Sequence, residues 1–158
     1  MQASKKYFTQ QEALVKAANY CAYQERCHTE IWAKLQEWGI YGDEANHIVL
    51  FLLENNYLNE ERFAKAFAGG KFRVKKWGRS KIKRELKHRQ ISDFCIAIGL
   101  KEIDSEDYTK TLHEVLQKQI DKSKIKHPIL LKQKVFQYAM QRGYESDIIQ
   151  DVLKSMGY

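Results

Sequence analysis

Hydrophobic residues recur every three or four positions along most of the chain, which is the period of an amphipathic α-helix. No stretch alternates apolar and polar residues for long enough to indicate a β-strand. The single proline, Pro128, precedes Ile-Leu-Leu and suits the first turn of a helix, where a missing N–H does no harm. The pattern therefore predicts an all-α fold.

Residues that favour helix ends stand at the borders of the periodic segments. Short polar side chains that can accept a hydrogen bond from a free amide precede four segments, at Thr9, Asn59, Ser92 and Asp104. Thr9 also has Glu12 three residues later, which is the spacing of a capping box. Gly39 and Gly143 follow periodic runs and can adopt the left-handed conformation that ends a helix.

The same arrangement of apolar residues occurs three times, at intervals of about 50 residues. In each copy an apolar residue is followed by another four positions later and by a third after nine. The copies are Ile31, Leu35 and Ile40; Ile82, Leu86 and Ile91; and Val135, Ala139 and Tyr144. A longer amphipathic segment precedes each copy and a shorter one follows it. After a tail at 1–8, we expect three-helix repeats at 9–58, 59–103 and 104–158, stacked in an elongated, curved array.

The first helix of the second repeat contains two adjacent glycines, Gly69 and Gly70, which cost about 2 kcal/mol in a helix interior. An apolar stripe nevertheless continues through them, formed by Phe63, Phe67, Gly70, Val74 and Trp77. The stripe predicts one helix over 59–76, with Gly70 allowing a close neighbour. A loop at 69–70 is the alternative.

Composition indicates a folded protein that does not span a membrane. Of 158 residues, 44% are hydrophobic and 12% aromatic, whereas disordered chains are poor in both classes. The longest apolar run has six residues, at 48–53, far below the ~20 that cross a bilayer. The first residues lack the apolar stretch of a signal peptide, so we expect a cytoplasmic protein.

The cysteines do not predict a metal site or a disulfide framework. Cys21, Cys27 and Cys95 are odd in number and include no C-x-x-C pair. Cys27 stands beside His28, but a closed zinc site needs four ligands and no second pair occurs. We expect buried, reduced thiols.

Positive charge is concentrated in one part of the chain. The formal net charge is +7, with residues 59–100 at +8 and the flanking parts near neutrality. Between 71 and 89 the chain has ten basic residues and one acidic residue, Glu85. The ten are Lys71, Arg73, Lys75, Lys76, Arg79, Lys81, Lys83, Arg84, Lys87 and Arg89. A helix surface usually mixes signs to form i,i+4 pairs, so this segment favours an anionic partner, either phosphate or an acidic protein surface.

Two less specific interpretations apply to the same segment. The basic residues could form a solvated face that only aids solubility. Trp77, flanked by Lys76 and Arg79, could stack on nucleic-acid bases, although the apolar stripe places it against the core. We favour a binding surface with Trp77 packed inward.

The sequence contains no recognisable catalytic constellation. The five histidines are scattered, and phosphate-loop, zinc-protease and serine-hydrolase motifs are missing. Glu60 and Glu61 are adjacent carboxylates, but their place at a helix start is explained by the helix dipole. We expect a protein that is not an enzyme and uses no cofactor and no metal.

Two motifs of the second repeat resemble the RecX family, the bacterial regulators of the RecA recombinase. The more specific motif is Leu53-Glu-Asn-Asn-Tyr-Leu-Asn-Glu-Glu-Arg-Phe-Ala64, and Trp77-Gly-Arg-Ser-Lys-Ile-Lys-Arg-Glu-Leu86 with Arg89-Gln-Ile91 supports it. The resemblance extends over residues 9–158. Asn59 stands where the family often has Asp, and Gln90 replaces the glycine of the other repeats, which leaves the end of that helix open.

The resemblance implies a non-enzymatic protein that binds the groove of the RecA–DNA filament and restrains ATP hydrolysis, strand exchange or filament growth. It implies weak, sequence-independent binding of single- or double-stranded DNA, no membrane partner, and a free protein that is monomeric. One alternative is a helix-turn-helix transcription factor, although 81–89 is rich in Lys and Arg and poor in residues that read bases. The other is a repeat scaffold for an unrelated protein.

Overall fold

The computed structural model describes residues 8–158, and over that range the chain forms nine α-helices and one π-helical turn with no strand. The first three helices are α1 (Gln10–Tyr23), α2 (His28–Glu37) and α3 (Gly42–Glu54). Next come α4 (Glu60–Gly70), the π turn η1 (Lys71–Lys75), α5 (Arg79–His88) and α6 (Asp93–Leu100). The last three are α7 (Ser105–Lys122), α8 (Pro128–Gln141) and α9 (Ser146–Ser155).

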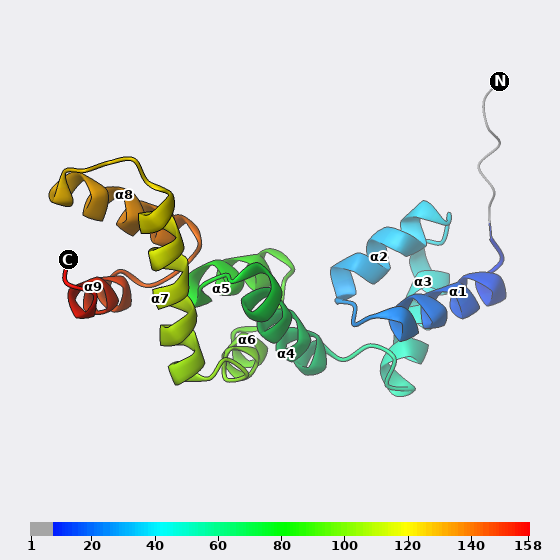
Figure 1. Ribbon diagram of the computed structural model, residues 1–158. Coiled ribbons are helices and arrows are strands. Elements are labelled where there is room, and N and C mark those ends of the chain that lie inside the picture. Colours follow the sequence, from blue (N-terminus) through cyan, green and yellow to red (C-terminus); the bar gives the residue numbers. More distant parts are fainter. Residues whose placement is uncertain (1–7) are drawn as a thin grey trace, which may run out of the picture.

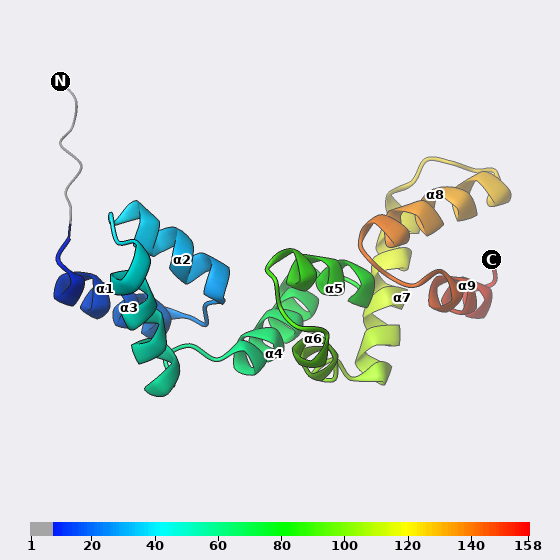
Figure 2. The ribbon, with the colours of Figure 1, turned by 180° about the vertical axis from the view of Figure 1, so that it is seen from behind.

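The helices form three consecutive triplets, which Figures 1 and 2 show as an extended array with the first and third triplets at opposite ends. The nine repeat positions read from the sequence are all buried, each with at most 5% of its surface exposed. Burying one such aliphatic side chain contributes roughly 1.5–3 kcal/mol. The all-α repeat prediction is therefore confirmed, whereas the exact repeat boundaries stay a prediction.

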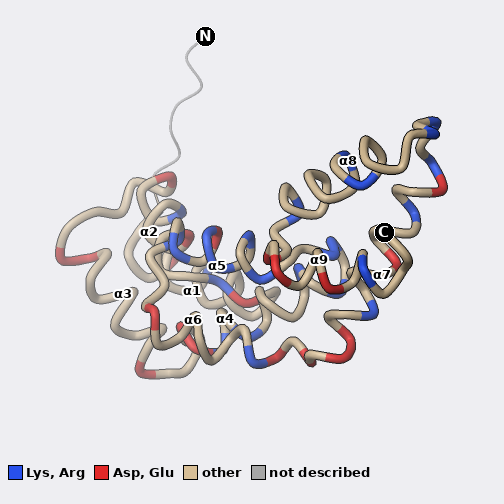
Figure 3. Tube along the Cα trace, turned by 90° about the vertical axis from the view of Figure 1, so that its left-hand side faces the viewer, with Lys and Arg blue, Asp and Glu red and all other residues tan. Residues whose placement is uncertain are grey.

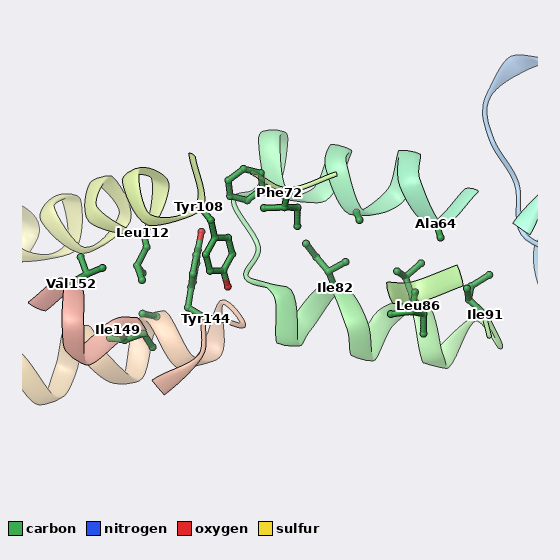
Figure 4. Packing of buried hydrophobic residues seen from close by; sticks show 14 of the residues in the cluster. Ala64, Phe72, Ile82, Leu86, Ile91, Tyr108, Leu112, Tyr144, Ile149 and Val152 are labelled. Atoms are coloured by element: carbon green, nitrogen blue, oxygen red, sulfur yellow. The ribbon is translucent and has the colours of Figure 1, made fainter. Parts of the chain in front are cut away.

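The three triplets have two hydrophobic cores between them. α1, α2 and α3 enclose one core around Ile31, Leu35 and Leu52. The second and third triplets share the other core, which continues between them through contacting aromatic rings. Tyr108 lies 5.8 Å from Phe72 and 5.1 Å from Tyr144, measured between ring centroids, and Figure 4 shows these rings between the two sets of helices.

The predicted helix ends are confirmed. The side chains of Thr9, Asn59, Ser92 and Asp104 each accept a hydrogen bond from the amide three residues later, at 2.8–3.3 Å. Gly39 and Gly143 have φ of 78° and 97°, and Gln90 adopts the same left-handed conformation with φ of 60°. The next amide then bonds back to the helix in all three triplets, so α5 ends at the equivalent place without glycine.

Helical backbone continues through Gly69 and Gly70, as predicted, but the final turn differs from an α-helix. Because η1 pairs residues five apart, it holds more residues per turn and rotates the side chains that follow. Phe72 is consequently 7% exposed and Val74 is 77% exposed, so the prediction that Val74 faces the core is wrong.

The close neighbour expected at Gly70 is also absent, because a Cβ there would meet no described atom within 4 Å. The close approach is made by Gly99 of α6, where a Cβ would lie 2.7 Å from the Ala64 carbonyl oxygen of α4. Hence the small residue that permits tight helix packing in this triplet belongs to α6.

The remaining predictions concern the chain start, the thiols and the apolar runs. The predicted tail lies outside the described residues except Phe8, whose ring packs edge-on against Trp38 at 6.3 Å. Cys21, Cys27 and Cys95 are buried free thiols, as predicted, and burial raises the pKa of Cys21 to about 11. Among residues 8–158, no helix is long and apolar enough to cross a bilayer.

Candidate functional site

The ten candidate binding residues lie on the π turn, on the connection after it and on α5. Ile82 and Leu86 of α5 are fully buried, and this orientation directs Lys83, Arg84 and Lys87 to the surface. The exposed basic side chains of η1 are Arg73 and Lys75, and Lys76 directly after the turn is exposed as well. Burial of the apolar positions therefore determines which basic residues face solvent.

Seven of the ten have no carboxylate oxygen within 4.0 Å among residues 8–158. We call these seven the basic surface: Lys71, Arg73, Lys75, Lys76, Lys81, Lys83 and Arg84. Figure 3 shows the resulting basic segments along α5, whereas acidic segments lie mainly elsewhere on the chain. Like charges placed so close together repel one another, which favours an external anion as their partner.

The other three form ion pairs within the protein. Arg79 lies 3.3 Å from Glu145 of the third triplet and stacks on the ring of Tyr108 at 3.8 Å. Arg89 pairs with Glu85 at 3.0 Å, and this hydrogen bond lowers the pKa of the Glu85 carboxyl. Lys87 reaches Asp93 only at 3.9 Å with both side chains exposed, so this pair is weak. Arg89 has the i,i+4 partner that its spacing from Glu85 allows, whereas the partner of Arg79 is distant in the sequence and could not be read from the local pattern.

Three of the candidates gather around one aromatic pair. The rings of Phe67 and Trp77 lie 6.4 Å apart, and Lys71 is 5.4 Å from the first and 5.1 Å from the second. Lys81 lies 4.5 Å from the Trp77 ring, and Arg89 lies 4.7 Å from the Phe67 ring. Trp77 is half-buried against the larger core, which favours packing over base stacking.

The structure does not place all ten residues on one face. Successive residues of an α-helix are about 100° apart, so Lys83 and Lys87 lie on the opposite flank of α5 from Lys81. Arg84 points away from the buried side between these flanks. The exposed cations therefore surround the solvent side of α5, an arrangement that suits contact with a broad anionic surface.

The sequence did not indicate that the third triplet fixes the backbone of the basic segment. Arg142 donates a hydrogen bond from Nη2 to the carbonyl of Lys75 at 2.7 Å, and the Tyr144 hydroxyl donates to the carbonyl of Lys76 at 2.8 Å. Lys76 is held in the left-handed conformation, with φ of 56°. The repeat pattern in the sequence identifies Tyr144 as an apolar position but does not indicate that its hydroxyl donates a hydrogen bond.

Metal-ligating side chains do not gather anywhere in the described part of the chain: no group of three His, Cys, Asp or Glu residues lies close enough to hold an ion. The arrangement that stands out chemically is the basic surface. It can bind anions through charge and hydrogen bonds from ammonium and guanidinium groups.

Two family models match the chain, one over the triplet that carries this surface and one over the triplet that follows. The model described as the second three-helix domain of RecX matches residues 59–100, and the model of the third three-helix domain matches residues 106–153. Together they cover more than half of the chain.

Curated relatives carry the same family name. The regulatory protein RecX of Clostridium perfringens strain SM101 is 31% identical over 129 residues, which are 80% of this chain and 60% of that protein. The regulatory protein RecX of Bacillus cereus strain AH187 is 29% identical over 147 residues, or 92% and 54%. The chain therefore spans between half and two thirds of the length of these relatives.

Solved structures share the fold. The crystal structure of RecX from Lactobacillus salivarius superposes with a TM-score of 0.83 and 20% identity, covering 94% of this chain and 96% of that one. A second crystal structure of a regulatory protein RecX gives 0.83 and 19%, covering 92% and 73%. At this identity the likeness establishes the arrangement of the helices.

Proposed function

Because this chain belongs to the RecX family, we propose that it regulates RecA by binding the RecA–DNA filament through its basic surface. The curated relatives are named regulatory proteins, which supports a regulatory role without chemistry of its own. Any change in ATP hydrolysis would then occur in RecA.

The observation that carries the proposal is the group of seven cations that have no carboxylate partner among residues 8–158. DNA phosphates of the filament, or acidic RecA side chains beside them, would supply the missing negative charge. The exposed residues of α5 are mainly Lys and Arg, which bind phosphate irrespective of sequence, so this surface suits a filament better than one operator site.

The extended shape of the protein suits the regulation of a filament. An array of three triplets presents a longer surface than a compact domain of the same mass, so it can contact several RecA protomers at once. A ligand that binds one filament state more tightly shifts the population toward that state. Bridging adjacent protomers in the groove would therefore restrain filament growth, strand exchange and the ATP hydrolysis linked to them.

Reversing charge on the basic surface tests the proposal. We expect K75E/K83E/R84E to abolish inhibition of RecA strand exchange, and co-sedimentation with ATP-loaded filaments to fall in parallel. All three side chains are exposed, so the helical circular dichroism should not change.

The matched control is K101E/K110E/K154E, which removes the same charge from exposed positions outside the basic surface. We expect it to retain most of the inhibition. Full inhibition by folded K75E/K83E/R84E, or equal losses in both variants, would show that the basic surface does not bind the filament.

A further inference from the structure

A groove lies beside the basic surface, where the end of η1 meets α7 and α8. It encloses about 260 Å³ and is lined by four basic side chains and one carboxylate, namely Lys76, Lys118, Lys122, Arg142 and Glu114. A smaller hollow of about 100 Å³ adjoins it, shares Lys122 and Tyr138 with it, and adds Lys134. The two hollows share lining residues, and five cations line them together.

The protein leaves these cations without ionic partners. Glu114 lines the groove but forms no ion pair within 4.0 Å in the described part of the chain. Lys118 and Lys122 are four residues apart on α7, a spacing at which like charges destabilise a helix. The helix dipole accounts for Lys122 in the last turn. Lys118 follows Glu114 by four residues, a favourable spacing, but their side chains form no ion pair in the described structure.

Contacts with the second triplet and with its own helix hold Arg142 beside the groove. Its Nη2 donates to the Lys75 carbonyl at 2.7 Å, and its guanidinium lies 5.7 Å from the Tyr138 ring. The Nε atom is buried and has no hydrogen-bond acceptor among residues 8–158. A buried donor without an acceptor is unfavourable, so the Arg142 guanidinium keeps hydrogen-bonding capacity that the described part of the protein does not use.

Lys76 reaches the groove through an unfavourable backbone conformation. A left-handed conformation is unfavourable for a non-glycine residue, and here the Tyr144 hydroxyl holds it by donating a hydrogen bond to the Lys76 carbonyl. Cations from the second triplet and the third are thereby brought to one groove.

The shape and composition of the groove favour a polyanion with a repeating charge. Lys118 and Lys122 are separated by about 6 Å along α7, so the positive charges form a row. The centre of a protein interface is usually depleted in charged residues, whereas most of the residues that line this groove are charged. We propose that the groove binds the phosphodiester backbone of a nucleic-acid strand and continues the basic surface onto the third triplet, an inference that rests on the proposed function.

The experiment measures how salt affects binding of fluorescein-labelled oligothymidine to the full chain, by fluorescence anisotropy. K118Q/K122Q removes two exposed groove cations, and K110Q/K154Q removes two exposed cations from elsewhere on the third triplet. Each lost phosphate contact changes the log–log salt slope by about 0.7 for a single strand. We expect the groove variant to flatten the slope by about 1.4 and the control variant to leave it unchanged.

Two further probes identify the anion. The same oligothymidine annealed to oligoadenine tests for a duplex, for which the expected flattening is about 1.8. Polyglutamate tests for an acidic protein. If polyglutamate displaces oligothymidine as effectively as unlabelled oligothymidine at equal charge, or if both lysine variants give the same slope, the groove is not a nucleic-acid site.

Failure of this inference can be distinguished from failure of the proposed function. A wild-type slope for K118Q/K122Q, together with loss of RecA inhibition in K75E/K83E/R84E, would refute the groove and leave the proposed function standing. A flattened slope together with full inhibition by K75E/K83E/R84E would support the groove and contradict the proposed use of the basic surface.

Discussion

At the scale of single residues, buried tyrosine hydroxyls form hydrogen bonds between the second and third triplets. The Tyr108 hydroxyl accepts a hydrogen bond from the Arg79 amide at 3.0 Å and donates one to the Glu145 carboxylate. Burial is the main cause that raises the pKa values of Tyr108 and Tyr144. These hydroxyls therefore stay protonated, so each can donate the hydrogen bond that it forms.

The raised pKa values predict that the protein loses stability in mild alkali. The pKa of the Cys21 thiol is raised from 9.0 to about 11, and both tyrosines are raised above 10.0. Above about pH 9 the unfolded chain releases protons that the folded chain keeps, so the free energy of unfolding falls as pH rises. Urea unfolding at about pH 8 and about pH 10.5 should show a lower midpoint at the higher pH.

Cys21→Ala provides the control for this measurement, because it removes the thiol from the linkage. The variant should lose less stability than the wild type between about pH 8 and about pH 10. A midpoint that is independent of pH in the wild type would contradict the expected direction.

At the scale of elements, the start of α5 and the end of α8 bring their backbones into direct contact. The Gly78 amide donates to the Arg142 carbonyl at 2.8 Å, and the Ser80 amide donates to the Gly143 carbonyl at 3.0 Å. A Cβ on Gly78 would lie 2.3 Å from the backbone of Gly143 and Tyr144. Close backbone approach therefore requires glycine at Gly78, although its φ of −77° suits any residue.

Alanine substitutions at two glycines should have opposite effects. Gly78→Ala should lower the free energy of unfolding by about 2 kcal/mol or more, because backbone atoms cannot move aside as side chains do. Gly70→Ala should raise it by roughly 1 kcal/mol, because the helical backbone there has open space around the added Cβ. Chemical denaturation measures both, and equal effects would contradict the close contact at Gly78.

At the scale of the whole molecule, three triplets share two cores. The first triplet is joined to the rest mainly through Cys27, which packs into the larger core, and an ion pair between Glu25 and Arg62. The second and third triplets share a continuous set of buried side chains, including three aromatic rings that contact one another at tilted angles. We therefore expect the triplets to unfold as two cooperative units.

Hydrogen exchange on two core variants tests this expectation. Leu35→Ala should reduce amide protection in α1, α2 and α3 and leave α8 unchanged, whereas Leu86→Ala should reduce protection from α4 to α9. Both leucines are fully buried, so each substitution should cost about 2–5 kcal/mol within its own unit. A uniform loss of protection in both variants would indicate a single cooperative unit.

Local patterns in the sequence determined the fold class, the helix ends and the buried repeat positions. Ile31, Ile82 and Val135 were identifiable because helical periodicity and capping act over a few residues. The concentration of charge in 71–89 was also readable, although its binding role stays a prediction.

Only the tertiary structure decided how these local features combine. The π turn reversed the expected orientation of Val74, Arg79 found its acid 66 positions away in Glu145, and Arg142 came beside Lys76. Each outcome depends on packing between segments that are far apart in the chain. Such contacts do not produce a periodic pattern in the local sequence, so they could not be predicted from it.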